Sequence, residues 1–141
     1  MIDLFSRWRK RSKLSVVPDV PKSIAEWFDR IGRTFPPPDG IVALNIGVFE
    51  TPNGYTIYLT GSTEYDADSD DWACREDYAP KDRYFELPSE FTNGKDWQEV
   101  EKDLKLLIRN ILSSDQFANN ILARPEVFAI GFDDGNLTRL K

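Results

Sequence analysis

The amino-acid sequence predicts an α+β fold: a mainly antiparallel sheet of about four to six strands, packed by about two or three helices in a single layer on one face. Two stretches around residues 52–54 alternate apolar and polar side chains, as the strands of a half-buried hairpin do. Two other stretches carry apolar residues at helical spacing behind a capping residue. The 141 residues are 40% hydrophobic and 13% aromatic, which is enough for the core of one domain.

The sequence divides into a basic N-terminal segment with a proline-bounded connector, residues 1–21, and a single α+β domain, residues 22–141. Residues 1–13 carry five Lys or Arg and one Asp, beside the apolar side chains of Ile2, Leu4, Phe5 and Trp8. As a helix this segment would be amphipathic and could touch an anionic membrane or nucleic acid. The alternative is a terminal segment, or a first helix, whose aromatic side chains dock on the domain.

A first helix is predicted from Ser23 to Thr34. Ser23 is placed to cap it, and Glu26 follows three residues later, which is the capping-box pattern. The helix must end by Phe35, because three prolines follow and proline cannot donate a backbone hydrogen bond. The apolar face that helical spacing predicts consists of Ile24, Trp27, Phe28, Ile31 and Phe35.

A hairpin is predicted next, with strands at 42–48 and 55–60 joined by a turn at 51–54, where Pro and Gly stand as a turn requires. One face of the first strand is aliphatic. The other carries the small side chains of Ala43, Asn45 and Gly47, so another element, such as a helix, is expected to pack closely there.

The remaining elements follow a long polar stretch at 63–83, in which a short strand is expected around Trp72 to Cys74. A helix is predicted behind Asp96, with Glu99 completing a capping box. Its core face consists of Trp97, Val100, Leu104, Leu107, Ile108 and Ile111. The other predicted elements are a strand at 84–87, a short helix at 115–122, a strand at 127–132, a turn at 133–136 and a returning strand at 137–140.

Composition removes several classes of function. The chain has no histidine, so catalytic triads and zinc sites that depend on histidine are excluded. The single cysteine, Cys74, cannot form an internal disulfide and has no histidine to activate it. No secretory signal or long apolar run is present, so a cytoplasmic location is expected. No carboxylate pair has a spacing that marks a glycosidase, and the sequence shows no glycine-rich phosphate loop or nucleophile elbow. We expect no enzyme, no cofactor and no metal.

The strongest functional signal is a concentration of acidic and aromatic residues after the hairpin. Residues 14–141 carry a net charge of −10, which repels nucleic acid and attracts basic surfaces. Carboxylates steer a basic partner and aromatic side chains supply contact area, so this stretch predicts a protein-binding site. The predicted site consists of Glu64, Tyr65, Asp66, Asp68, Asp70, Asp71, Trp72, Glu76, Asp77 and Tyr78.

Two alternatives exist for the same residues. The aspartates from Asp66 onward match several positions of a calcium loop, but Asp71 replaces the required glycine and Asp77 replaces the bidentate glutamate. Trp72 and Tyr78 could instead anchor a solvated loop to the core. A second acidic pair, Asp133 and Asp134, is explained by the predicted turn at 133–136. It would belong to the same acidic face if the hairpin at 127–140 lies beside the hairpin at 42–60.

The stretch GYTIYLTGSTEYDADSDDWAC and the later AIGFDDGNL resemble the small acidic immunity-type proteins of bacterial polymorphic toxin systems. The resemblance covers residues 20–141 and implies a stoichiometric cytoplasmic protein that blocks a toxin domain through the acidic aromatic loop. The basic N-terminal segment departs from it. The sequence hypothesis is thus a non-enzymatic protein-binding module with a basic partner, such as a toxin domain. The alternatives are a calcium- or substrate-binding enzyme that uses the acidic loop, and a membrane-surface accessory protein tethered by residues 1–13.

Overall fold

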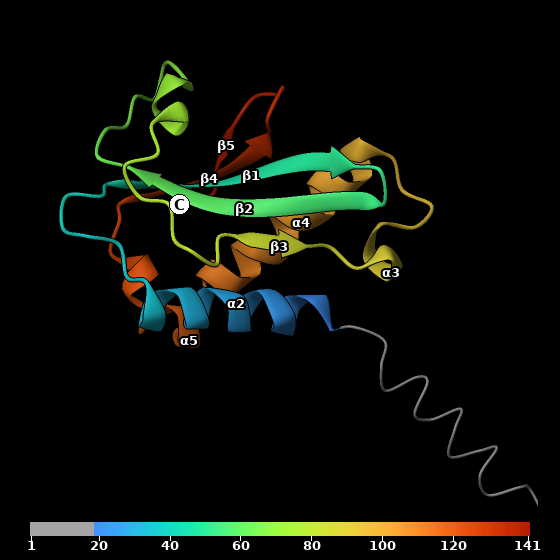
Figure 1. The fold of residues 1–141 in the computed structure, drawn as a ribbon, viewed down its shortest axis with the longest axis horizontal. Helices are drawn as coiled ribbons and strands as arrows, with labels where there is room; N and C mark the ends of the chain where they lie inside the picture. The colour runs from blue at the N-terminus through green and yellow to red at the C-terminus, as the bar shows by residue number, and fades with distance from the viewer. Residues whose placement is uncertain (1–18) are drawn as a thin grey trace, which may run out of the picture.

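Five strands form one sheet in the order β3-β2-β1-β4-β5 (Figure 1). The computed structural model describes residues 19–141, so the predictions for the basic N-terminal segment lie outside the described residues. The strands are β1 Ala43–Thr51, β2 Gly54–Ser62, β3 Tyr84–Glu86, β4 Val127–Phe132 and β5 Thr138–Arg139. All neighbours are antiparallel except β1 and β4, which are parallel. This confirms the predicted α+β class with a mainly antiparallel sheet.

The parallel pair of β1 and β4 depends on the long crossover between β3 and β4. β3 runs antiparallel to β2, so the chain must return along the sheet before β4 begins. Parallel neighbours need a connection long enough to return the chain to the starting edge, and a helix usually supplies it. Here α4 Trp97–Leu112 provides most of that length. The shorter elements of the crossover are α3 Ser89–Thr92, α5 Asp115–Ala118 and η2 Ile121–Ala123, and the single turn η1 Asp71–Cys74 lies earlier, between β2 and β3.

The first helix, α2, spans Val20–Thr34 and begins three residues before the predicted start. Its N-cap is Asp19, whose side chain accepts a hydrogen bond of 3.1 Å from the Lys22 amide. The prediction of Ser23 as the cap was wrong, and so was the assignment of Pro21 to the connector. Proline fits the first turn of a helix, because its missing N–H would have no partner there.

The helix α4 confirms the predicted capping box. Asp96 accepts from the Glu99 amide at 2.8 Å, and the Glu99 side chain accepts from the Asp96 amide at 3.5 Å. The predicted core face is buried except at Trp97, which is 51% exposed and packs edge-on against Phe132.

One face of the sheet packs on α2 and α4 and makes the main core (Figure 1). The aliphatic side chains predicted for this face of the hairpin are buried there except Val42, which packs, partly buried, in the cluster on the opposite face. Trp27 and Phe28 of α2 stack against each other beneath the sheet. The strand residues in this core are Leu44, Ile46, Val48, Ile57, Leu59, Phe128, Ile130 and Phe132. Within residues 19–141 no helix is both long and apolar enough to cross a membrane.

The opposite face, with the small residues of β1, is covered by loops. The expected covering helix and the short strand near Trp72 were both wrong: residues 71–74 form the single turn η1. Trp72 lies in a small apolar cluster with Ala43, Val127 and Ala129. The small side chains leave room for the indole of Trp72 to pack directly on the sheet. A single large side chain from a loop therefore covers this part of the surface.

Candidate functional site

The acidic residues lie on one closed excursion of the chain, residues 63–77, which we name the acidic loop. It leaves β2 at Ser62 and returns at Tyr78. The Gly61 amide donates to the Tyr78 carbonyl at 2.8 Å, and the Tyr78 amide donates to the Gly61 carbonyl at 3.1 Å. The two ends are therefore held together by a reciprocal pair of backbone hydrogen bonds, which shortens the flexible part of the loop.

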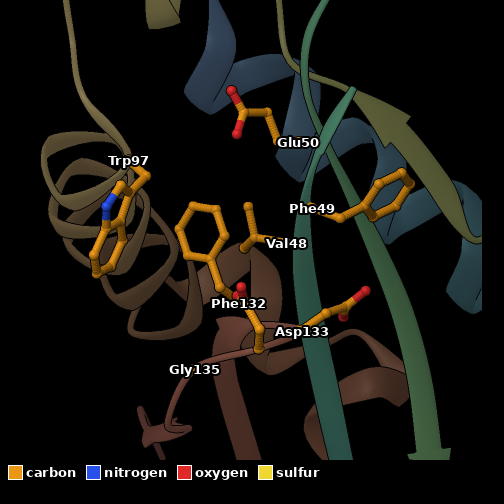
Figure 2. Close-up of a pocket in the computed structure, with 8 residues that line it drawn as sticks. Val48, Phe49, Glu50, Trp97, Phe132, Asp133 and Gly135 are labelled. Carbon is orange, nitrogen blue, oxygen red and sulfur yellow. The ribbon is translucent and has the colours of Figure 1, made fainter. Parts of the chain in front are cut away.

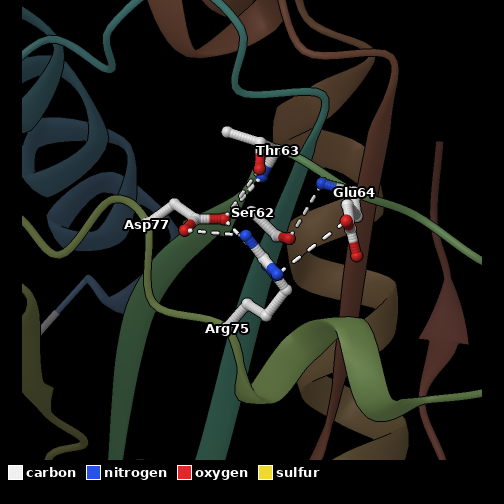
Figure 3. A network of polar contacts seen from close by, with 5 residues as sticks. All are labelled: Ser62, Thr63, Glu64, Arg75 and Asp77. Atoms are coloured by element: carbon white, nitrogen blue, oxygen red, sulfur yellow. Dashed lines mark hydrogen bonds and ion pairs between the residues drawn. The ribbon is translucent and has the colours of Figure 1, made fainter.

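A polar network closes the base of the loop (Figure 3). The Oδ2 atom of Asp77 accepts from the Thr63 amide at 2.9 Å and from its hydroxyl at 3.0 Å. Arg75 donates to the same oxygen at 3.3 Å and lies 3.8 Å from Glu64. The Thr63 amide and the Arg75 guanidinium lower the pKa of Asp77, and the hydrogen bond to Asp77 raises the pKa of Arg75. Asp77 and Arg75 thus serve the closure of the loop.

Asp77→Asn is expected to loosen this closure at neutral pH, because the amide keeps an acceptor oxygen but loses the negative charge that pairs with Arg75 and strengthens the bond from Thr63. The folded-state pKa of Asp77 is depressed, so its contribution is present above its ordinary value of 3.8 and is lost as pH falls through the folded pKa. Amide hydrogen exchange of Thr63 should accelerate in the variant, with the central β1–β2 amides as the internal control. Unchanged exchange at Thr63 would show that the carboxylate does not close the loop.

Aromatic and polar contacts fasten the outer part of the loop to the last strand. Tyr65 packs edge-on against Trp72, with ring centroids 5.3 Å apart. The Arg139 guanidinium of β5 lies 5.3 Å from the Tyr65 ring centroid. Asp70 accepts from the Leu137 amide at 3.1 Å. The loop is thus held at its base, at its centre and at its outer edge.

The structure separates the ten predicted site residues into two groups. Trp72 and Tyr78 are each 5% exposed and have the anchoring role that was the alternative interpretation; the Tyr78 hydroxyl donates to the Phe35 carbonyl. Asp70 and Asp77 are engaged in the contacts above. The remaining six present oxygen atoms or an aromatic ring at the surface: Glu64, Tyr65, Asp66, Asp68, Asp71 and Glu76.

The exposed carboxylates surround a shallow cavity in the loop. Its lining includes Glu64, Asp66 and Asp71, together with the rings of Tyr65 and Trp72. Its one cation, Arg75, is already paired with Asp77 and Glu64. Over residues 19–141 no three carboxylate or thiol groups converge as a metal site built from such side chains would require. The cavity thus presents negative charge and aromatic surface.

Sequence reasoning missed a contact on the same face of the sheet between Tyr58 and Asp133. The Tyr58 hydroxyl donates to the Asp133 carboxylate at 2.5 Å, across 75 residues of sequence. Burial, and then this bond, raise the pKa of Tyr58. Asp133 follows β4 at the predicted turn, so one carboxylate of the second acidic point has a structural partner. The sequence does place the tyrosine Tyr58 on a predicted strand, where its hydroxyl needs a hydrogen-bond partner if it is buried. Nothing near it in the sequence identifies Asp133 as that partner.

Tyr58→Phe is expected to lower the free energy of unfolding by about 1 kcal/mol, because one charge-assisted hydrogen bond at a partly exposed position is lost. The raised pKa favours the neutral phenol in the folded state. Its contribution is therefore complete below the ordinary pKa of 10.0 and is lost as pH rises through the folded value. Urea unfolding at pH 8 and pH 11 should show a smaller alkaline loss for Tyr58→Phe than for the wild type. Equal losses would contradict the assignment.

The site therefore combines a loop fastened to the sheet, a cluster of exposed carboxylates and a half-buried tyrosine. Its thiol, Cys74, is exposed and free. No family model, curated protein or solved structure matches the chain.

Proposed function

We propose that the protein is a non-enzymatic protein-binding module whose acidic loop binds a basic surface of a partner, and that it acts as an immunity-like inhibitor of a toxin domain. The observation that carries the proposal is the combination of exposed carboxylates with a loop held at three places. The class resemblance of the sequence supports the inhibitory role.

Preorganisation is the first physical argument. A loop that must be ordered on binding loses affinity, because each immobilised residue costs conformational entropy. The contacts of Trp72, Asp70 and Asp77 order the loop when the protein folds, so less conformational entropy is lost on binding. The backbone amide of Asp68 is likewise bonded to the Asp66 carboxylate at 2.8 Å, which fixes the turn between them.

Charge is the second argument. Like charges on one loop repel each other, and a basic partner relieves that repulsion while being steered to the surface. Asp66, Asp68 and Asp71 are exposed and form no ion pair with a Lys or Arg of residues 19–141. They are therefore available to an external cation, and Tyr65 beside them offers an aromatic contact.

The triple variant Asp66→Asn, Asp68→Asn, Asp71→Asn tests the binding role. Asparagine keeps the side-chain oxygen that bonds the Asp68 amide, so the loop should keep its shape. A matched control removes three exposed carboxylates outside the loop: Glu26→Gln, Glu90→Gln and Asp115→Asn. Both variants would be used as bait in extracts of the source organism.

We expect the wild type and the control to capture the same basic protein, and the loop variant to bind it about tenfold or more weakly. Higher salt should reduce that difference, because screening weakens exposed charge pairs. Equal affinity of the loop variant and the control for the captured protein would overturn the proposed binding surface.

Expression of the captured partner tests the inhibitory role. The partner's binding domain should arrest growth when expressed alone, and co-expression of the wild-type chain should restore growth. The triple loop variant should fail to restore it. A partner that leaves growth unaffected would contradict the inhibitory role and leave the binding role standing.

A further inference from the structure

A second concave surface lies where β1 and β4 end and α4 begins (Figure 2). We name it the end cleft. Its apolar part is formed by Val48 and Phe132, which are almost fully buried, and by Trp97, which is half exposed. Its acidic part is formed by Glu50, Asp133 and Asp134, which are exposed. Among residues 19–141, no lysine or arginine lines it.

We propose that the end cleft binds the basic N-terminal segment of the same chain, residues 1–13. The segment supplies what the cleft lacks: five cationic side chains with one acid, and the apolar side chains of Ile2, Leu4, Phe5 and Trp8. The aromatic side chains of the segment can pack against the indole of Trp97, and its cationic side chains can pair with the carboxylates of the cleft.

The start of α2 and the end cleft lie at the same end of the molecule. The helix begins at Val20 at the end of the molecule where β1 terminates, and the acidic loop lies at the other end of the sheet (Figure 1). The six residues 14–19 can span up to about 20 Å when extended. The segment is thus attached at the end of the sheet that carries the end cleft, and the acidic loop lies at the opposite end.

Trp97 provides the second structural argument. It occupies the first turn of α4 yet is 51% exposed, and its ring already contacts Phe132 at 5.6 Å between centroids. A large apolar side chain held at a cleft edge gains burial when another apolar group covers it. Trp8 or Phe5 would provide that cover, with Arg7 and Arg9 beside the carboxylates of Glu50 and Asp134.

Spin labelling of the full chain tests the proposal. The label is placed at Ser6→Cys after Cys74→Ser, an exposed position whose replacement leaves the core intact. We expect the amide signals of residues 49–50 and 133–135 to lose intensity in the nitroxide state and to recover on reduction. The additional pair Glu50→Gln and Asp134→Asn should diminish that loss, whereas Glu26→Gln and Glu90→Gln should not.

A second sample mixes isotope-labelled chain that carries no nitroxide with spin-labelled chain that carries no isotope. In this sample, only a contact between two copies of the chain can reduce the amide signals of the end cleft. Intensity losses at the cleft in the mixture would show that a second copy supplies the segment and would overturn the intramolecular contact. Losses centred on residues 64–71, or none in the described residues, would overturn the cleft as the binding surface. Each of these results is independent of the acidic loop and its external partner.

Discussion

Trp72→Ala is expected to lower the free energy of unfolding by about 3–5 kcal/mol, because a buried aromatic residue is replaced by a methyl group. Trp72 is 5% exposed and packs on Ala43 of β1 and on Val127 and Ala129 of β4. The same change removes the central attachment of the acidic loop. The variant should therefore lose stability and also lose affinity for the partner.

Urea unfolding measures the loss of stability, and amide hydrogen exchange of residues 64–74 measures the loosening of the loop that is expected to weaken binding. The matched control is Trp97→Ala, which removes an indole that is 51% exposed and should cost much less. If the two tryptophan variants lost equal stability, or if loop exchange were unchanged in Trp72→Ala, the anchoring role of Trp72 would be refuted.

Gly47→Ala is expected to lower the free energy of unfolding by about 1–3 kcal/mol through overpacking. A Cβ atom at this position would lie 2.0 Å from Cζ of Tyr58 and 2.3 Å from its hydroxyl oxygen. The ring would have to move, and the hydrogen bond from Tyr58 to Asp133 would be lost with it. The absence of a side chain at Gly47 thus makes room for the tyrosine that links β2 to the turn after β4.

A double-mutant cycle isolates this cause. Gly47→Ala should cost substantially less in a Tyr58→Ala background, because the ring that blocks the methyl group is gone. Gly135→Ala is the control, since its Cβ would meet Phe132 at an ordinary contact distance of 3.6 Å. If Gly47→Ala lowered the free energy of unfolding equally in both backgrounds, the cause would be the strand backbone and not the ring of Tyr58.

The elements that were predicted correctly depend on local patterns. The hairpin of β1 and β2 follows from alternation and from the turn at Pro52 and Asn53, and α4 follows from its capping box and apolar spacing. The start of α2 was missed because two local signals competed. Pro21 suggested a connector, but Asp19 caps a helix that accepts proline in its first turn.

The cover on the second face of the sheet could not be predicted in the same way. Small residues in β1 indicated that something packs closely there, but they could not distinguish a helix from the indole of Trp72. The parallel pairing of β1 with β4 and the bond from Tyr58 to Asp133 join residues more than seventy positions apart. Such contacts depend on topology, which local periodicity does not specify.

For the acidic loop, the sequence predicted the concentration of carboxylates but not which of them hold the loop and which are exposed to solvent. Asp70 and Asp77 look like Asp66 and Asp68 in the sequence, yet the first two accept hydrogen bonds that hold the loop. The difference arises from their neighbours in space, Leu137 and Thr63. A variant set that mixed the two groups would therefore confuse loss of structure with loss of binding.

The most direct test of the central claim is amide hydrogen exchange of the chain, alone and bound to the captured partner. Binding through the acidic loop predicts new protection at residues 64–71, with the solvent-facing side of α4 unchanged, and a weaker effect at higher salt. Protection confined to α2, α4 or the end cleft, with residues 64–71 exchanging as in the free chain, would contradict the claim.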